Sequence, residues 1–226
     1  MQTKRLFYFP CFLILIALLS SCSATHQAYL RTLKVAFDES KDIVLKNSDI
    51  LQSPADLIYV KKGDASTIVL ALAFIEDDQY KWISADKVAL IEQNGRLVKT
   101  LALEQNLDFV YAETTDPLIT PSKLSDDVSW FRQIDFANTY YGVRVNSIFT
   151  NKGVQHLNIQ ELSIETLLIE EQVVVSDNTK HSFNDNNWLN YFWVSKDTGK
   201  IIRSKQKLVP GGDVFDIIYV SRALRL

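Results

Sequence analysis

The chain has 226 residues, of which 24 are Lys or Arg and 27 are Asp or Glu, so its formal net charge at pH 7 is −3. The basic residues form no tract, which disfavours nucleic acid as a partner. Because the chain is 47% apolar and has only two cysteines, a folded domain must be held by its hydrophobic core and not by a framework of disulfides.

Residues 1–21 have the features of an export signal. Lys4 and Arg5 supply positive charge, and an apolar run occupies residues 6–19. That run contains Pro10 and is shorter than the roughly 20 residues that a membrane-spanning helix needs, so we interpret it as a cleavable signal peptide. No later stretch of the sequence is long and apolar enough for a transmembrane helix.

The motif that closes this signal, Leu19-Ser20-Ser21-Cys22, resembles the lipobox of bacterial lipoproteins, in which the cysteine is acylated and becomes the first mature residue. The alternative is an ordinary signal peptide that happens to contain Cys22. Each buried methylene of an acyl chain contributes about 0.8 kcal/mol, so several chains anchor a protein durably. Ser23 follows where an aspartate would resemble an inner-membrane retention signal. We therefore expect Cys22 to hold the protein on outer-membrane lipid, facing the periplasm.

Residues 22–28 are expected to form a short lipidated polar tether, and residues 29–226 a single β-rich periplasmic domain. Between Tyr29 and about Leu45, apolar positions recur near helical spacing with charged residues between them, which predicts an amphipathic helix. Lys46-Asn47-Ser48-Asp49 is predicted to end this helix.

Beyond Leu57 the sequence changes to short runs of Val, Ile, Leu and aromatic residues separated by polar breaks, which is typical of strands. The first predicted strands are residues 57–60, 67–75, 80–83 and 87–92. Asn94-Gly95 is the strongest hairpin signal, because a type I′ turn requires positive φ at both central residues. Residues 103–127 are less regular.

A second series of strands is predicted at residues 128–136, 141–150, 154–159, 163–175, 188–195, 200–208 and 214–220. Asn151-Lys152-Gly153 and Asp197-Thr198-Gly199 are predicted to be hairpin turns. Alternating polarity in residues 142–150 indicates that the sheet has one buried face and one solvent-exposed face. The fold class is therefore mainly β, a curved antiparallel meander or partly open β-barrel with an N-terminal amphipathic helix.

The sequence predicts no catalytic residue, no metal site and no cofactor. His26, His156 and His181 have no further ligand at metal-binding spacing, and both cysteines are assigned, Cys11 to the signal peptide and Cys22 to lipid. Serine nucleophile motifs and phosphate-binding glycine loops are absent from the sequence.

Acidic clusters raise the alternative of a glycan-modifying hydrolase, because two carboxylates can perform glycoside hydrolysis. These clusters are Glu76-Asp77-Asp78 and the set Glu161, Glu165 and Glu170-Glu171. Roles in turns and on solvated faces account for them better.

Aromatic residues are concentrated between residues 188 and 194. Trp188, Tyr191 and Trp193 are candidates for contact with a glycan or a partner protein, because a flat aromatic surface stacks on sugar rings or fills a partner's pocket. The alternative is that alternate members of this run fill the core of the sheet.

Several motifs along the chain are distinctive when taken in order. They are LALAFIEDDQYKW at residues 70–82, NGRLVKT at 94–100, Asn106-Leu107, DPL at 116–118, YFWV at 191–194, GKIIRS at 199–204, and Gln206. Together they resemble the YjbF/GfcB group of lipoproteins, which is linked to exopolysaccharide and group 4 capsule production. The resemblance extends from about residue 49 to residue 220, and the lipobox agrees with it.

This resemblance implies a non-enzymatic outer-membrane lipoprotein with a β-rich fold. It would be an accessory subunit in exopolysaccharide or capsule secretion or assembly, acting beside an outer-membrane β-barrel protein and, as a further candidate ligand, the polysaccharide. A lipid or lipoprotein carrier with an apolar cavity is the alternative from another class, and the hydrolase is the third.

Overall fold

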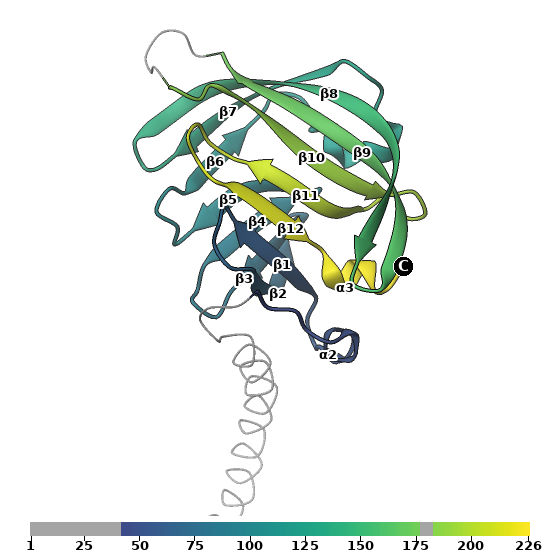
Figure 1. Ribbon diagram of the computed structural model, residues 1–226. Helices are drawn as coiled ribbons and strands as arrows, with labels where there is room; N and C mark the ends of the chain where they lie inside the picture. Colours follow the sequence, from purple (N-terminus) through teal and green to yellow (C-terminus); the bar gives the residue numbers. More distant parts are fainter. Residues whose placement is uncertain (1–41, 177–182) are drawn as a thin grey trace, which may run out of the picture. The chain divides into compact units, whose positions relative to one another are not determined.

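The computed structural model describes residues 42–176 and 183–226, which form a curved β-sheet (Figure 1). Cys22, the predicted signal peptide, the tether and residues 29–41 of the predicted helix lie outside the described residues. Among the described residues, no helix reaches the length and hydropathy required to cross a bilayer.

Six strands lie in the first half of the described chain, and six more lie in the second half. The first six are β1 (Leu57–Lys62), β2 (Ile68–Glu76), β3 (Gln79–Ile83), β4 (Ala89–Gln93), β5 (Arg96–Leu101) and β6 (Leu107–Tyr111). The others are β7 (Val128–Phe136), β8 (Tyr140–Ile159), β9 (Leu162–Val175), β10 (Asn187–Ser195), β11 (Ile201–Lys207) and β12 (Val214–Ile218). The short helices of the described chain are α2 (Asn47–Gln52), η1 (Pro117–Ile119), η2 (Pro121–Lys123) and α3 (Val220–Ala223).

The strands are antiparallel and follow the order β5-β4-β3-β2-β1-β12-β11-β10-β9-β8-β7-β6. Strands that follow one another in sequence therefore pair, except β5 and β6, and β1 also pairs with β12, so that the sheet curls into a nearly closed barrel (Figure 1). The ends of the sheet are β5 and β6, which share no ladder. This line between β5 and β6 is called the seam below. The predicted mainly β, partly open barrel is confirmed.

The core follows from two-residue alternation along the strands. In β10, for example, Trp188, Asn190, Phe192 and Val194 point inward, and Phe192 is completely buried. Large apolar side chains from both halves of the sheet pack together around Phe149, Ile169 and Phe192. Burial of each such side chain contributes about 1.5–3 kcal/mol, so this interior holds the barrel together.

Most of the predicted strands are confirmed, and β7 has the predicted limits. The Asn94-Gly95 hairpin is confirmed by φ values of 52° and 81°. The predicted turn at residues 151–153 is wrong, because β8 continues through it and accommodates the extra residues as a bulge opposite Ile169 and Leu167. Strand β6, within the segment predicted to be irregular, was not anticipated.

The predicted end of the N-terminal helix is also wrong. Residues 42–46 are not helical, and α2 begins at Asn47, where the sequence predicted a helix to finish. Instead, the Leu45 amide donates to the Tyr59 hydroxyl at 2.9 Å, and Asp42 Oδ1 accepts from the Thr67 amide at 2.9 Å. The Leu45 amide, which a helix would otherwise satisfy, is thus satisfied by the sheet, and Asp42 satisfies the amide that precedes β2.

Candidate functional site

The three aromatic residues that the sequence indicated as a contact surface lie on opposite faces of strand β10. Trp188 faces the interior and is 8% exposed, whereas Tyr191 and Trp193 are half-buried on the outer face. The rings of Tyr191 and Trp193 lie 6.2 Å apart between centroids, and the guanidinium of Arg203 lies 5.2 Å from the Trp193 centroid. The structure therefore brings together Tyr191 and Trp193, which we call the outer aromatic pair, and places Trp188 elsewhere.

The acidic clusters occupy turns and solvated ion pairs, except that Glu171 is buried inside the barrel and the predicted solvated role is wrong for it. Asp77 and Asp78 have φ values of 51° and 59° in the β2–β3 turn, and Glu76 is paired with Lys81. Glu165 on β9 is paired with Lys196. The lysine hydrogen bonds lower the pKa of Glu76 and of Glu165.

Strands β2 and β9 are separated in the sheet by β1, β12, β11 and β10, so the two clusters belong to different parts of the barrel. Within residues 42–176 and 183–226, no group of three or more His, Cys, Asp or Glu residues is arranged to hold a metal ion.

A network of buried charges lies inside the barrel around Glu171 on β9. The Glu171 carboxylate is completely buried and accepts hydrogen bonds from Arg96 at 2.9 Å and 3.1 Å, and from Arg132 at 3.1 Å. Ser147 and Asn190 donate to the same carboxylate at 2.5 Å and 3.0 Å. Because every donor comes from a different strand, this one carboxylate links β5, β7, β8 and β10 to β9.

The electrostatics of this network follow from burial and pairing. Burial alone would raise the pKa of Glu171, but Arg96 and Arg132 hold that pKa at about 2. Burial lowers the pKa of Arg132 to about 10 despite the attraction of Glu171, and Arg132 stays protonated at neutral pH. Burial opposes the charge of Arg96 as well, yet Asp116 and Glu171 raise its pKa. Glu171, Arg96 and Arg132 are therefore all charged at pH 7.

Arg96 also connects the network to the protein surface at the seam. Its Nε donates to Asp116 Oδ2 at 2.5 Å, and its guanidinium lies 4.7 Å from the ring centroid of Trp130. The Asp116 carboxylate in turn accepts from the Leu118 amide at 2.9 Å and so caps η1. With its donors occupied by two carboxylates, Arg96 has a structural role.

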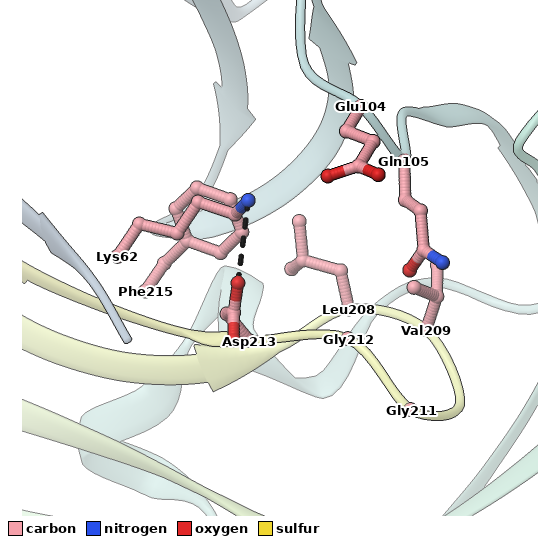
Figure 2. Close-up of a pocket in the computed structure, with 9 residues that line it drawn as sticks. All are labelled: Lys62, Glu104, Gln105, Leu208, Val209, Gly211, Gly212, Asp213 and Phe215. Atoms are coloured by element: carbon pink, nitrogen blue, oxygen red, sulfur yellow. Dashed lines mark ion pairs between the residues drawn. The ribbon is translucent and has the colours of Figure 1, made fainter. Parts of the chain in front are cut away.

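A small pocket of about 200 Å³ lies beside the loop that joins β5 to β6 (Figure 2). Lys62 and Asp213 form an ion pair of 3.3 Å there, and Glu104 and Gln105 approach from the β5–β6 loop (Figure 2). The lysine charge is neutralised by Asp213, which leaves the Glu104 carboxylate as the other charged side chain of this lining.

A larger groove of about 490 Å³, which we call the seam groove, lies between β5 and β6. Its lining residues come from β3, β4, β5, β6, β7 and the loop after β6. They are Gln79, Gln93, Arg96, Val98, Lys99, Asp108, Phe109, Val110, Tyr111, Ala112, Thr114, Asp116 and Trp130. The sequence did not point to this groove, because its main aromatic residues lie on the strand that was not predicted.

Comparisons with known proteins agree with the fold and with the sequence motifs. Residues 30–220 match the family described as "Group 4 capsule polysaccharide lipoprotein gfcB, YjbF". The uncharacterized lipoprotein GfcB of Escherichia coli K12 is 30% identical over 205 residues, which cover 89% of this chain and 93% of GfcB. The uncharacterized lipoprotein YjbF of the same strain is 30% identical over 211 residues, covering 92% of this chain and 94% of YjbF.

The crystal structure of the hypothetical lipoprotein YmcC from Escherichia coli K12 superposes with a TM-score of 0.72 at 28% identity. That match covers 87% of this chain and 93% of YmcC. The chain therefore belongs to the YjbF family of group 4 capsule polysaccharide lipoproteins.

Proposed function

We propose that acyl chains on Cys22 hold this protein on the periplasmic face of the outer membrane, where it is a non-enzymatic accessory subunit in the secretion or assembly of a capsule or exopolysaccharide. Membership of the YjbF family is the observation that carries this proposal. The lipobox-like Leu19-Ser20-Ser21-Cys22 supports the lipid anchor, and Ser23 favours the outer membrane over the inner one.

The arrangement of the charged groups supports a non-enzymatic role. The buried carboxylate of Glu171 is occupied by two arginines, Ser147 and Asn190, and Glu76 and Glu165 are paired with lysines on the surface. A general acid needs a raised pKa, whereas the pKa values of these three carboxyl groups are lowered. These features disfavour the hydrolase alternative.

The interior of the described barrel disfavours the lipid-carrier alternative. Packed apolar side chains occupy one part of it, and the charged network around Glu171 occupies another. An acyl chain placed there would displace buried ion pairs, and breaking such a pair costs about 3–5 kcal/mol.

We propose that the outer aromatic pair, Tyr191 and Trp193, contacts an outer-membrane β-barrel protein of the same export system. Aromatic residues are enriched at the centres of protein interfaces because they bury large areas at low entropic cost. Arg203, which lies over the Trp193 ring, adds a side chain that is also enriched at such centres.

The anchoring claim is tested by replacing Cys22 in cells that lack the chromosomal copy. We expect Cys22→Ser to leave the outer-membrane fraction and to lower the amount of polysaccharide on the cell surface. Ser23→Asp keeps the lipid and should move the protein to the inner membrane, while Ser23→Ala serves as the matched control and should behave as wild type. Outer-membrane fractionation together with full polysaccharide output from Cys22→Ser would overturn the anchoring role.

A further inference from the structure

We propose that the seam groove binds an uncharged stretch of the polysaccharide chain itself. This inference rests on the proposed function in polysaccharide secretion and adds a specific ligand and site to it. The groove volume of about 490 Å³ lies within the roughly 300–1,000 Å³ that is typical of ligand sites.

Two exposed aromatic side chains on β6 line the groove. Phe109 and Tyr111 are 56% and 51% exposed, and both belong to its lining. They lie two residues apart on the same strand, so they project from the same face of the sheet. A sugar ring presents an apolar C–H face that stacks on an aromatic ring, and neighbouring sugars of a chain can occupy two such rings in turn.

Amide side chains across the seam supply matching hydrogen-bonding groups. Gln79 on β3 and Gln93 on β4 are cross-strand partners and line the groove together. Each amide has a carbonyl acceptor and two N–H donors, which is the combination that sugar hydroxyls require because they both donate and accept. Aromatic rings on one side and amides on the other fit a glycan.

The balance of charge favours an uncharged segment. Lys99 on β5 and Asp108 on β6 line the groove with opposite charges, and Arg96 in its floor is neutralised by Asp116. The buried network beneath Arg96 fixes this floor, since Arg96 is bonded to Glu171 as well.

A peptide strand that pairs with the open edges of the seam is the alternative occupant. Hydrogen bonds that these edges already make disfavour it. Gln206 occupies the edge of β5, with its Oε1 accepting from the Leu97 amide at 3.0 Å and its Nε2 donating to the Gly95 carbonyl at 2.8 Å. The Leu107 amide of β6 donates to Thr100 Oγ1 at 2.9 Å.

Irregularities in the neighbouring ladders disfavour strand addition further. The β4–β5 ladder shifts register after Ile91, and the β6–β7 ladder shifts between Leu107 and Phe109. Bulges and charged side chains are the devices by which natural edge strands avoid pairing with another chain. The seam is therefore protected from backbone pairing while its side chains stay accessible.

The test is direct binding of oligosaccharides, prepared by partial hydrolysis of the bacterium's own surface polysaccharide, to the full lipidated protein in detergent micelles. Titration calorimetry of wild type should show binding, and the double variant Phe109→Ala/Tyr111→Ala should lower the affinity at least tenfold. Phe131→Ala is the matched control, because Phe131 on β7 is 61% exposed and does not belong to the groove lining. Its affinity should stay within twofold of wild type.

Equal unfolding midpoints would establish that the double variant is folded. Raising NaCl from 50 to 500 mM should change the affinity less than threefold, because an uncharged ligand displaces few counterions. The groove assignment is overturned if wild type does not bind, if the double variant and Phe131→Ala bind equally, or if the affinity falls steeply with salt. These outcomes leave the Cys22 experiment unaffected, so failure of the groove is distinguishable from failure of the proposed function.

Discussion

At the scale of single residues, Glu171 connects more of the barrel than any surface charge does. It is buried with Arg96 and Arg132, and removal of one member of a buried ionic group leaves the other charges uncompensated. We expect Glu171→Gln to lower the free energy of unfolding by about 3–5 kcal/mol, measured by urea denaturation.

The adjacent residue provides the control for this substitution. Glu170 forms a partly solvated pair with Lys152 at 3.3 Å, and such pairs contribute about 0–1 kcal/mol. Glu170→Gln should therefore change the free energy of unfolding by less than about 1 kcal/mol. Equal losses in the two variants would show that the buried network does not stabilise the barrel.

The same carboxylate predicts a pH dependence of stability. The pKa of Glu171 is about 2 in the folded protein and 4.5 in the reference state, so the unfolded chain binds the proton more tightly. The stabilisation is complete above the unfolded value and is lost as the pH falls from about 4.5 to about 2. Over this range, wild type should lose about 3 kcal/mol more than Glu171→Gln in urea titrations. Parallel pH profiles of the two proteins would contradict this.

At the scale of elements, two glycines with positive φ lie at irregular points of the sheet, one in the β4–β5 turn and one in the β8 bulge. Gly95 has φ +81° in the β4–β5 turn, and an added Cβ would come within 2.3 Å of Ile201 Cδ1. Gly153 has φ +84° in the β8 bulge, and an added Cβ would meet no atom within 4 Å. A side chain added at either position would meet backbone strain, but only at Gly95 would it also collide with a neighbouring side chain.

We therefore expect Gly153→Ala to lower the free energy of unfolding by about 1–2 kcal/mol, the cost of a left-handed residue with a side chain. Gly95→Ala should cost about 1–3 kcal/mol more, because it also overpacks against Ile201. Urea denaturation of both variants measures the difference. A loss at Gly153 as large as that at Gly95 would mean that backbone strain alone decides both positions.

The sequence predicted the elements with strong alternation and missed those without it. β7 alternates clearly and was predicted within its limits, whereas β6 has five residues and follows an irregular loop. Asn151-Lys152-Gly153 has the composition of a turn, but pairing of both flanking segments with β9 makes it a bulge. Local composition does not distinguish these two outcomes.

The sequence carries a signal of the charged interior in the alternation of its strands. Arg132 lies at an inward position between Trp130 and Ile134, and Glu171 lies between Ile169 and Val173. Both charges therefore interrupt an apolar face at two-residue spacing. Which charges pair could not be predicted, because Arg96, Arg132 and Glu171 come from strands far apart in sequence. The seam groove, which depends on how β5 and β6 meet, could not be predicted for the same reason.

At the scale of the whole molecule, pairing of β1 with β12 joins the first and last strands of the described chain and leaves the outer face of the sheet continuous from β1 to β10. The outer aromatic pair lies on this face. Trp193→Ala should reduce recovery of the proposed β-barrel partner at least fivefold in co-purification. Leu189→Ala is the matched control, because Leu189 is an exposed apolar residue on the same strand and should leave recovery unchanged. Equal recovery with both variants would remove Trp193 from the interface.

We propose above all that the protein is an accessory subunit of a polysaccharide export system at the outer membrane. The most direct test is affinity purification of the lipidated protein, tagged at its exposed C-terminal Leu226, from detergent-solubilised outer membranes. We expect an outer-membrane β-barrel protein of the export system to be recovered in stoichiometric amount. Recovery of the tagged protein without such a partner, from cells that are actively exporting polysaccharide, would contradict the claim.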